Sequence, residues 1–148
     1  MFEKGTADKD VIEFIQSKIR KAKLTKKLTI IDPYFFNSGK LSLAEKPTIL
    51  EILKPFNQLE KLEIITKKNY NKANFEWYKK SLKNVDITVI AEENFHDRFW
   101  IIDENKAFIV GTSVNGFGNK HFFIQDDYLS DNDTQTLLNL YTKSSWTN

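Results

Sequence analysis

Cysteine is absent from this chain of 148 residues, and histidine occurs only twice. Without a thiol, the protein has no disulfide framework, no thiolate metal site and no cysteine nucleophile. The N-terminal decapeptide MFEKGTADKD carries charges where a signal peptide has an apolar run, and no apolar stretch approaches the ~18 residues of a membrane span. We therefore expect a soluble, cytoplasmic protein without a transmembrane segment.

The length predicts a single domain over residues 1–148, because a chain of this size can bury roughly 68–70% of its unfolded surface in one core. A C-terminal fragment of a larger protein is the alternative. His, Asp and Glu do not cluster at the spacing of metal ligands, so we expect neither a metal nor another cofactor.

The net charge of +2 is too small to make the whole molecule a polycation. Basic residues nevertheless gather between Lys18 and Lys27, where six of ten positions are Lys or Arg. A second stretch mixes lysines with aromatic residues, namely Lys67, Lys68 and Lys72 with Tyr70, Phe75 and Trp77. The first stretch suits nucleic acid, anionic lipid or mere solubility, and the second suits single-stranded nucleic acid through charge and stacking. For the second, we favour a solvated start of a helix whose aromatic side chains belong to the core.

Strand-like and helix-like patterns alternate along the first part of the chain. Helical spacing of apolar residues predicts helices over 8–23, 48–53 and 75–82, and branched apolar runs predict strands over 28–32, 62–66 and 85–89. Three strand-like segments follow at 98–103, 106–112 and 121–125, and then a last helix with Leu137, Leu138 and Tyr141. We therefore predict an α/β fold: a mixed sheet flanked by helices, with strand–helix alternation, a three-strand meander and a C-terminal helix.

The most distinctive segment begins at one of the histidines and reads HDRFWIID, residues 96–103. Because side chains alternate along a strand, His96 and Arg98 project from the same face and can reach one ligand. Imidazole can attack phosphorus or pass a proton near about pH 7, and a guanidinium can grip two phosphoryl oxygens. A hydrogen-bonded pair at a sheet edge is the structural alternative. Asp103 falls on the opposite face, which favours a role in the hairpin turn that follows.

A loop rich in glycine and hydroxyl groups, GTSVNGFG, follows at residues 111–118. Backbone N–H groups in such a loop can approach an anion closely. The run from 96 to 115 resembles the half-motif of the phospholipase D superfamily, in which His-x-Lys and an aspartate precede Gly-Ser-x-Asn. The matching residues are His96, Arg98, Asp103, Gly111 and Asn115.

Two departures from the superfamily pattern stand out. Arg98 replaces the usual lysine, and the gap before Gly111 is one residue longer than usual. Either Thr112 or Ser113 therefore takes the serine position, and Ser113 is the better match if Asn115 is the asparagine. The chain also resembles short bacterial and phage-associated phospholipase-D-like domains, and the C-terminal lipid-binding domain of MIT-domain proteins, which read His-Asp-Arg. The earlier IIDPYFF, residues 30–36, resembles the first strand and turn of these domains.

The resemblance implies a metal-independent, nuclease-like phosphodiesterase that uses a phosphohistidine intermediate. Because the chain holds one half-site, it would act as a homodimer, with His96 as nucleophile in one subunit and general acid in the other. Arg98 and Asn115 would bind phosphoryl oxygens, while Thr112 or Ser113 and Lys120 would line the rim. The alternative is a non-catalytic module that recognises phosphate in nucleic acid or acidic lipid.

Two further positions are candidates for the pocket. Asp32 and Tyr34 follow the first strand, where ligands of α/β sheets commonly bind, although Asp-Pro is also an ordinary turn at a strand end. The second histidine, His121, is either another imidazole of the same pocket or a half-buried structural residue.

Overall fold

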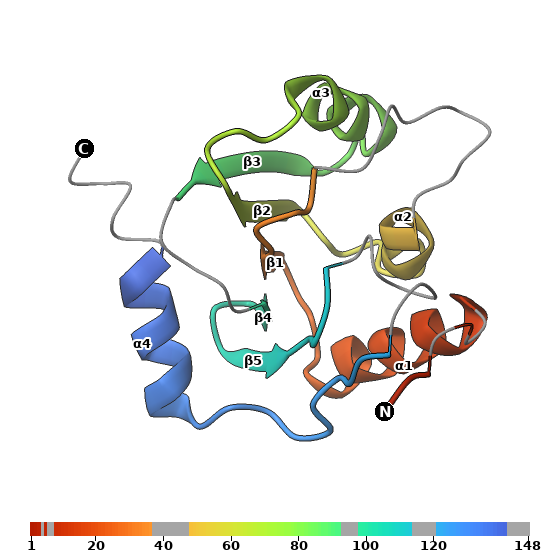
Figure 1. Ribbon diagram of the computed structural model, residues 1–148, viewed down its shortest axis with the longest axis vertical. Helices are drawn as coiled ribbons and strands as arrows, with labels where there is room; N and C mark the ends of the chain where they lie inside the picture. The colour runs from red at the N-terminus through yellow and green to blue at the C-terminus, as the bar shows by residue number, and fades with distance from the viewer. Residues whose placement is uncertain (4, 6–7, 37–47, 93–97, 114–120, 142–148) are drawn as a thin grey trace.

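A computed structural model describes residues 1–3, 5, 8–36, 48–92, 98–113 and 121–141. Its elements are α1 (Asp8–Lys21), β1 (Lys27–Ile31), α2 (Thr48–Leu53), β2 (Lys61–Thr66), α3 (Lys72–Ser81), β3 (Asp86–Ala91), β4 (Phe99–Ile102), β5 (Lys106–Ile109) and α4 (Asp131–Tyr141). The predicted α/β fold, with a mixed sheet, flanking helices and a C-terminal helix, is confirmed (Figure 1).

The described strands form one five-stranded sheet in the order β3-β2-β1-β4-β5. β1 runs parallel to β2, and β2 runs parallel to β3. β4 is antiparallel to β1, and β5 is antiparallel to β4. Ile31 at the end of β1 therefore pairs with Phe99 at the start of β4, and Phe99 pairs with Ile109 at the end of β5. The ends of β1, β2 and β5 and the start of β4 thus share one edge of the sheet.

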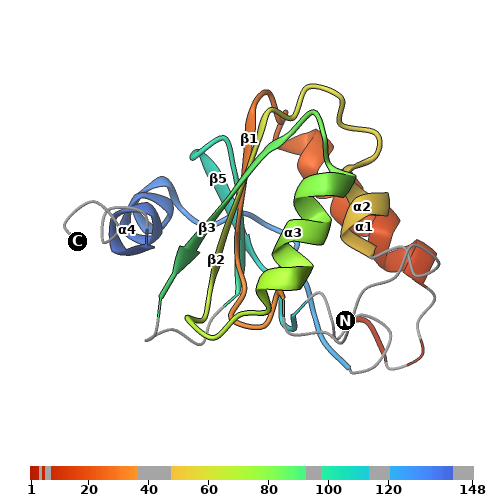
Figure 2. The ribbon, with the colours of Figure 1, turned by 90° about the horizontal axis from the view of Figure 1, so that it is seen from above.

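Helices cover both faces of the sheet. Figure 2 shows α1, α2 and α3 on one side and α4 on the other. Leu28 and Ile30 of β1 belong to the larger core, together with apolar residues of α1 and α2, whereas Ile31 belongs to a smaller core with Leu137 and Leu138 of α4. Burial on both faces explains why β1 and β2 read as nearly continuous apolar runs.

The last part of the predicted meander differs from expectation. β4 and β5 form as predicted, but segment 121–125 makes only isolated bridges. These bridges join Phe2 with Phe122 and Val110 with Ile124. The N–H of Gln125 donates to the carbonyl of Ile109 at 3.0 Å, but the return bond from the Ile109 N–H goes to the side-chain oxygen of Gln125 at 3.1 Å. This exchange of a main-chain acceptor for a side-chain acceptor interrupts the ladder.

Aromatic packing fixes the turn that follows β1. Phe36 is fully buried, and its ring centroid lies 5.7 Å from that of Tyr70 and 5.8 Å from that of Phe75. The buried side chain of Asn74 donates to the carbonyl of Phe36 at 3.1 Å. The aromatic residues of the second basic stretch therefore belong to the core, as the favoured interpretation holds. The helix begins earlier than its apolar spacing predicts because Asn71 caps it, accepting the N–H of Asn74.

One residue of the basic run from 18 to 27, Lys18, is not on the surface. Lys18 is only 4% exposed, and its ammonium contacts a backbone carbonyl and lies over three aromatic rings, of which Phe108 and Tyr128 are the nearest. The contacts are the carbonyl of Asp126 at 2.7 Å and the ring centroids of Phe108 at 4.9 Å and Tyr128 at 4.5 Å. Lys18 is thus a packing residue that joins α1 to the segment before α4.

Candidate functional site

A buried carboxylate joins two strand ends at the edge where β1 finishes. Asp32, the first residue after β1, is 2% exposed. Its Oδ2 accepts the hydroxyl of Ser113 at 2.8 Å, and its Oδ1 accepts the N–H of Tyr34 at 2.9 Å. The bond to Ser113 ties the loop after β5 to the turn after β1.

Both hydroxyl residues of that loop, Thr112 and Ser113, are buried. A serine hydroxyl has a single hydrogen to donate, and that of Ser113 points at Asp32. While this bond is made, Ser113 orders the loop and does not donate to a phosphate oxygen.

Arg98 lies at the same edge, immediately before β4. Its carbonyl accepts the N–H of Val110 at 3.1 Å, which extends the pairing of β4 with β5 by one residue. The guanidinium carbon lies 5.8 Å from the ring centroid of Tyr34. The Nε of Arg98 is buried and has no hydrogen-bond partner among the described residues. Because an unsatisfied buried donor costs roughly 1–3 kcal/mol, this N–H favours a site for an acceptor such as a phosphoryl oxygen.

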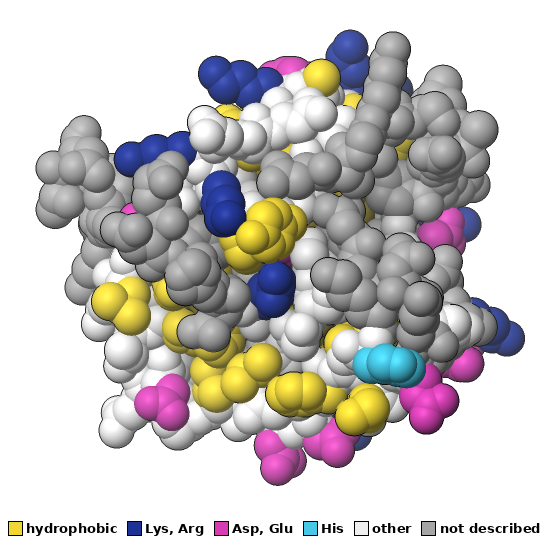
Figure 3. Space-filling model, in the orientation of Figure 1, with side chains coloured by type: hydrophobic (Ala, Val, Ile, Leu, Met, Phe, Trp, Pro, Cys, Tyr) yellow, Lys and Arg dark blue, Asp and Glu magenta, His cyan; other side chains and the backbone are white. Residues whose placement is uncertain are grey.

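Tyr34 contacts a second cation, Lys67, which the sequence analysis did not place in the site. The Lys67 ammonium donates to the Tyr34 hydroxyl at 3.1 Å and lies 4.4 Å from the ring centroid. Figure 3 shows basic and hydrophobic side chains next to one another near the middle of this face. Lys67 is the first residue after β2, as Asp32 is after β1, and that shared position was the signal that could have identified it.

Tyr78 of α3 packs beneath the turn and is 3% exposed. Its ring centroid lies 5.3 Å from that of Phe35. Burial, and then the negative charge of Asp32, raise the pKa of the Tyr78 phenol well above its usual range. Tyr78 therefore stays neutral, and the Asp32 carboxylate has an uncharged phenol near it.

Asp103 lies at the opposite edge of the sheet, in the turn between β4 and β5. Asp103 and Glu104 both have left-handed backbones, with φ of 53° and 56°. The Asp103 carboxylate accepts the backbone N–H groups of Thr25, Lys26 and Lys27 at 2.7, 2.9 and 2.9 Å. Burial alone would raise the pKa of this carboxyl, but the hydrogen bonds together outweigh burial and hold its pKa below the usual range. Asp103 thus joins the hairpin to the connection between α1 and β1.

Gly111 allows two backbones to approach closely. A Cβ at this position would lie 2.7 Å from the carbonyl oxygen and 3.1 Å from the nitrogen of Phe123. The N–H of Gly111 donates to that same carbonyl at 2.7 Å. A side chain here would push segment 121–125 away from the end of β5.

Three predicted site residues, His96, Asn115 and Lys120, lie outside the described residues. The second histidine, His121, is exposed. The residues that the structure does bring together at one edge of the sheet are Asp32, Tyr34, Lys67, Arg98, Thr112 and Ser113.

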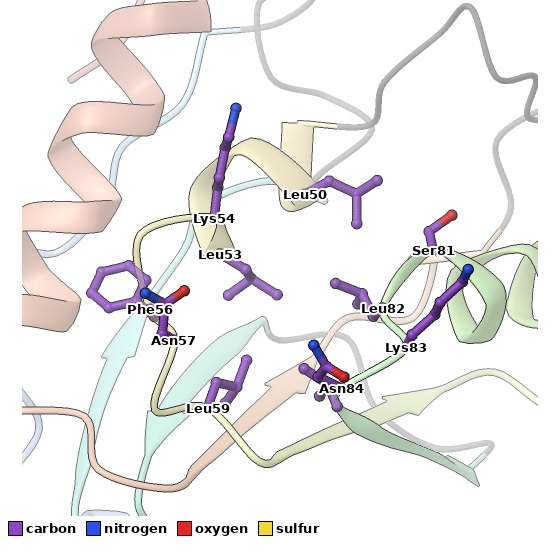
Figure 4. A pocket seen from close by; sticks show the side chains of 11 residues that line it. Leu50, Leu53, Lys54, Phe56, Asn57, Leu59, Ser81, Leu82, Lys83 and Asn84 are labelled. Atoms are coloured by element: carbon purple, nitrogen blue, oxygen red, sulfur yellow. The ribbon is translucent and has the colours of Figure 1, made fainter.

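A hollow of about 310 Å³ lies elsewhere, between α2, the end of α3 and the start of β3. Figure 4 shows the side chains of Leu50, Leu53 and Leu82 around a common space. Since β3 begins here, the hollow lies at the edge opposite Asp32 and Arg98. Among the described residues that line it, the only ionisable groups are two lysines, so it offers no acid–base pair.

Neither a metal centre nor a membrane span is found in the part of the chain that the structure describes. No three His, Cys, Asp or Glu side chains lie close enough there to hold a metal ion. No helix of this part is sufficiently long and apolar to cross a bilayer.

Comparison with known proteins shows a fold likeness. No protein-family model and no curated protein matches the sequence. NucT from Helicobacter pylori has a similar structure, with a TM-score of 0.52 and 17% identity over 95% of this chain and 87% of that chain. TrmBL2, an archaeal chromatin protein with a novel mode of DNA binding, matches with a TM-score of 0.46 and 14% identity over 99% of this chain. The match covers 51% of TrmBL2, so this chain spans about half its length.

The likeness to NucT extends over nearly the whole chain and concerns the fold. The chain therefore has a fold similar to that of NucT, and the resemblance that HDRFWIID and the following glycine loop predict is confirmed at the level of the fold.

Proposed function

We propose that the chain is a metal-independent phosphodiesterase that cleaves nucleic acid at a site shared by two copies of the chain. The observation that carries this proposal is the buried Nε of Arg98, which has no partner among the described residues and lies at the edge that also holds Thr112 and Ser113. A phosphoryl group supplies the acceptor oxygen that this Nε lacks. The phospholipase-D-like fold supports the same chemistry.

In the proposed reaction, an imidazole nitrogen of His96 attacks phosphorus and the bond from phosphorus to the leaving oxygen breaks. His96 of the partner subunit gives its proton to that oxygen, and the same imidazole then takes a proton from water. The resulting hydroxide attacks phosphorus and the phosphorus–nitrogen bond breaks, which frees His96. Arg98 and Asn115 hold the non-bridging oxygens as negative charge develops on them. Neither step needs a metal ion or an organic cofactor.

One observation favours a second function, a module that binds phosphate without cleaving it. Arg98 stands where the superfamily has lysine, and its guanidinium lies against the ring of Tyr34. A planar guanidinium on an aromatic ring is suited to holding an anion through paired hydrogen bonds, and lysine does not reproduce that geometry. The ligand of such a module is nucleic acid or an anionic lipid.

The decisive experiment is cleavage in EDTA of labelled single- and double-stranded DNA, of RNA and of a chromogenic phosphodiester. The native chain is compared with His96→Ala and with His121→Ala, which removes the other histidine as a matched control. We expect the native chain and His121→Ala to cleave, and His96→Ala to be slower by at least about a thousandfold, as for loss of a nucleophile. Complete loss of native activity in EDTA would contradict the covalent mechanism.

A measurement of mass in solution tests the shared site. We expect a dimer at micromolar concentration, because one chain supplies one His-x-Arg half-site. A strictly monomeric chain that cleaves would contradict a site built from two copies of His96. If neither the native chain nor His96→Ala cleaves while both bind nucleic acid or anionic vesicles, the recognition module is the better description.

A further inference from the structure

Hydrogen bonds to the turn after β1 fix the backbone position of Lys67. Its N–H donates to the carbonyl of Pro33 at 3.4 Å, and the hydroxyl of Thr66 donates to the same carbonyl at 3.0 Å. The N–H of Asp32 donates to the carbonyl of Ile65, the residue before Thr66, at 3.0 Å. The end of β2 and the turn after β1 therefore form one unit, and Lys67 rises from it beside Tyr34.

The ammonium of Lys67 keeps donor capacity for a ligand. It has three N–H groups, and the bond to the Tyr34 hydroxyl at 3.1 Å uses one. No carboxylate pairs with Lys67 among the described residues, where the ion pairs involve Lys9 and Lys27. The residue is half-buried, whereas its ammonium lies at the exposed surface, where a ligand can reach it.

Lys67 and Arg98 reach the same ring from different strands. Since the sheet order is β2-β1-β4, their backbones are two strand spacings apart, about 10 Å, with the turn of β1 between them. The ammonium lies 4.4 Å and the guanidinium carbon 5.8 Å from the centroid of Tyr34. Both cationic groups thus lie beside the ring of Tyr34, at one edge of the sheet.

We propose that Lys67 binds the phosphate next to the one held by Arg98, with both cations placed beside the ring of Tyr34. This inference rests on the proposed function and extends it. The site then prefers a nucleic-acid strand, which carries a phosphate at every step, over an isolated phosphodiester or a lipid with one phosphate. Lys67 is a specificity residue in this scheme, outside the chemistry at His96.

The test compares Lys67→Met with Lys68→Met, which removes the same charge from the exposed neighbouring residue. Binding of a fluorescent single-stranded oligonucleotide is measured by anisotropy over a range of salt concentrations. We expect Lys67→Met to weaken binding by about five- to tenfold and to reduce the slope of log K against log salt by about 0.7, the value for one phosphate on a single strand. Lys68→Met should change the slope far less, and Lys67→Arg should retain it.

Cleavage adds a second readout. The ratio of kcat/KM for the oligonucleotide to kcat/KM for a chromogenic phosphodiester should fall about tenfold in Lys67→Met and stay constant in Lys68→Met. If the native chain cleaves and Lys67→Met keeps the native ratio and salt slope, the subsite is refuted and the proposed function stands.

If the native chain does not cleave, the salt slopes alone still decide the role of Lys67, and the proposed function fails separately. Absence of oligonucleotide binding by the native chain overturns the inference. So does a loss in Lys67→Met that is confined to vesicles containing an anionic phospholipid.

Discussion

Replacing Asp103 with alanine removes the acceptor of three backbone N–H groups and one hydroxyl, those of residues 25–27. Buried hydrogen bonds to a charged acceptor contribute about 1.5–3 kcal/mol each, but this carboxylate is only partly buried and water will solvate part of the freed backbone. We therefore expect Asp103→Ala to lower the free energy of unfolding by about 2–4 kcal/mol. For a chain of this length that corresponds to a fall in Tm of about 5–15 °C.

Urea and thermal unfolding followed by circular dichroism measure this change. Glu104→Gln is the matched control, because Glu104 lies in the same turn and loses only its surface ion pair with Lys27, whose Nζ lies 2.7 Å from Glu104 Oε1. Such an exposed pair contributes at most about 1 kcal/mol. Equal unfolding midpoints for Asp103→Ala and Glu104→Gln would refute the structural role given to Asp103.

The pH dependence of the unfolding free energy of Asp103→Ala tests whether the hydrogen bonds to the carboxylate cause the loss of stability. The pKa of Asp103 is held below its usual range in the folded chain, whereas an unfolded aspartate titrates at about 3.9. The carboxylate therefore stabilises the fold fully above about pH 4, and this contribution is lost as the pH falls through the folded pKa. The difference in the free energy of unfolding between the native chain and Asp103→Ala should become smaller below about pH 4. A difference that stays constant down to about pH 2 would contradict the hydrogen-bond account.

Three further substitutions test other contacts by urea unfolding. Gly111→Ala should destabilise the fold by about 1–3 kcal/mol, since its Cβ would lie 2.7 Å from the Phe123 carbonyl oxygen; an unchanged midpoint would contradict that close approach. Ser113→Ala should cost about 1–3 kcal/mol because it removes a buried hydrogen bond to Asp32, and a cost near zero would count against that bond. Burial lowers the pKa of Lys18, so the native chain should gain stability relative to Lys18→Met as the pH rises from about 7 toward 10; a parallel pH dependence would show that burial does not perturb this lysine.

The fold could be predicted from local patterns because the apolar pattern of each strand reflects which of its faces are buried. The run LTII in β1 is apolar at successive positions, which is what burial on both faces of a sheet requires. The position of Asp32 and Tyr34 at the edge of the candidate site followed from a general rule on strand ends, and that of Arg98 from its motif. These predictions needed only the sequence within a few residues of each position.

Contacts between distant segments could not be predicted in this way. Ser113 and Asp32 are 81 positions apart, and Lys67 and Tyr34 are 33 apart, so no local pattern joins them. In the sequence, Lys67 stands beside other lysines and aromatic residues, so its neighbours along the chain indicate a basic and aromatic stretch and give no sign of the contact with Tyr34. Lys18 is different, since it follows Val11 at helical spacing on the apolar stripe of α1, and this position alone indicates burial.

The spacing of the half-motif has a structural explanation in the length of one strand. The four residues between Arg98 and Asp103 are Phe99–Ile102, which make up the whole of β4. Arg98 therefore lies at the edge with Asp32, and Asp103 lies at the opposite edge, where it holds residues 25–27. After that turn β5, again four residues long, brings the chain back to the first edge at Gly111. The aspartate of the motif therefore acts on the scaffold, and the arginine lies at the edge of the proposed site, because a short strand places them at its two ends.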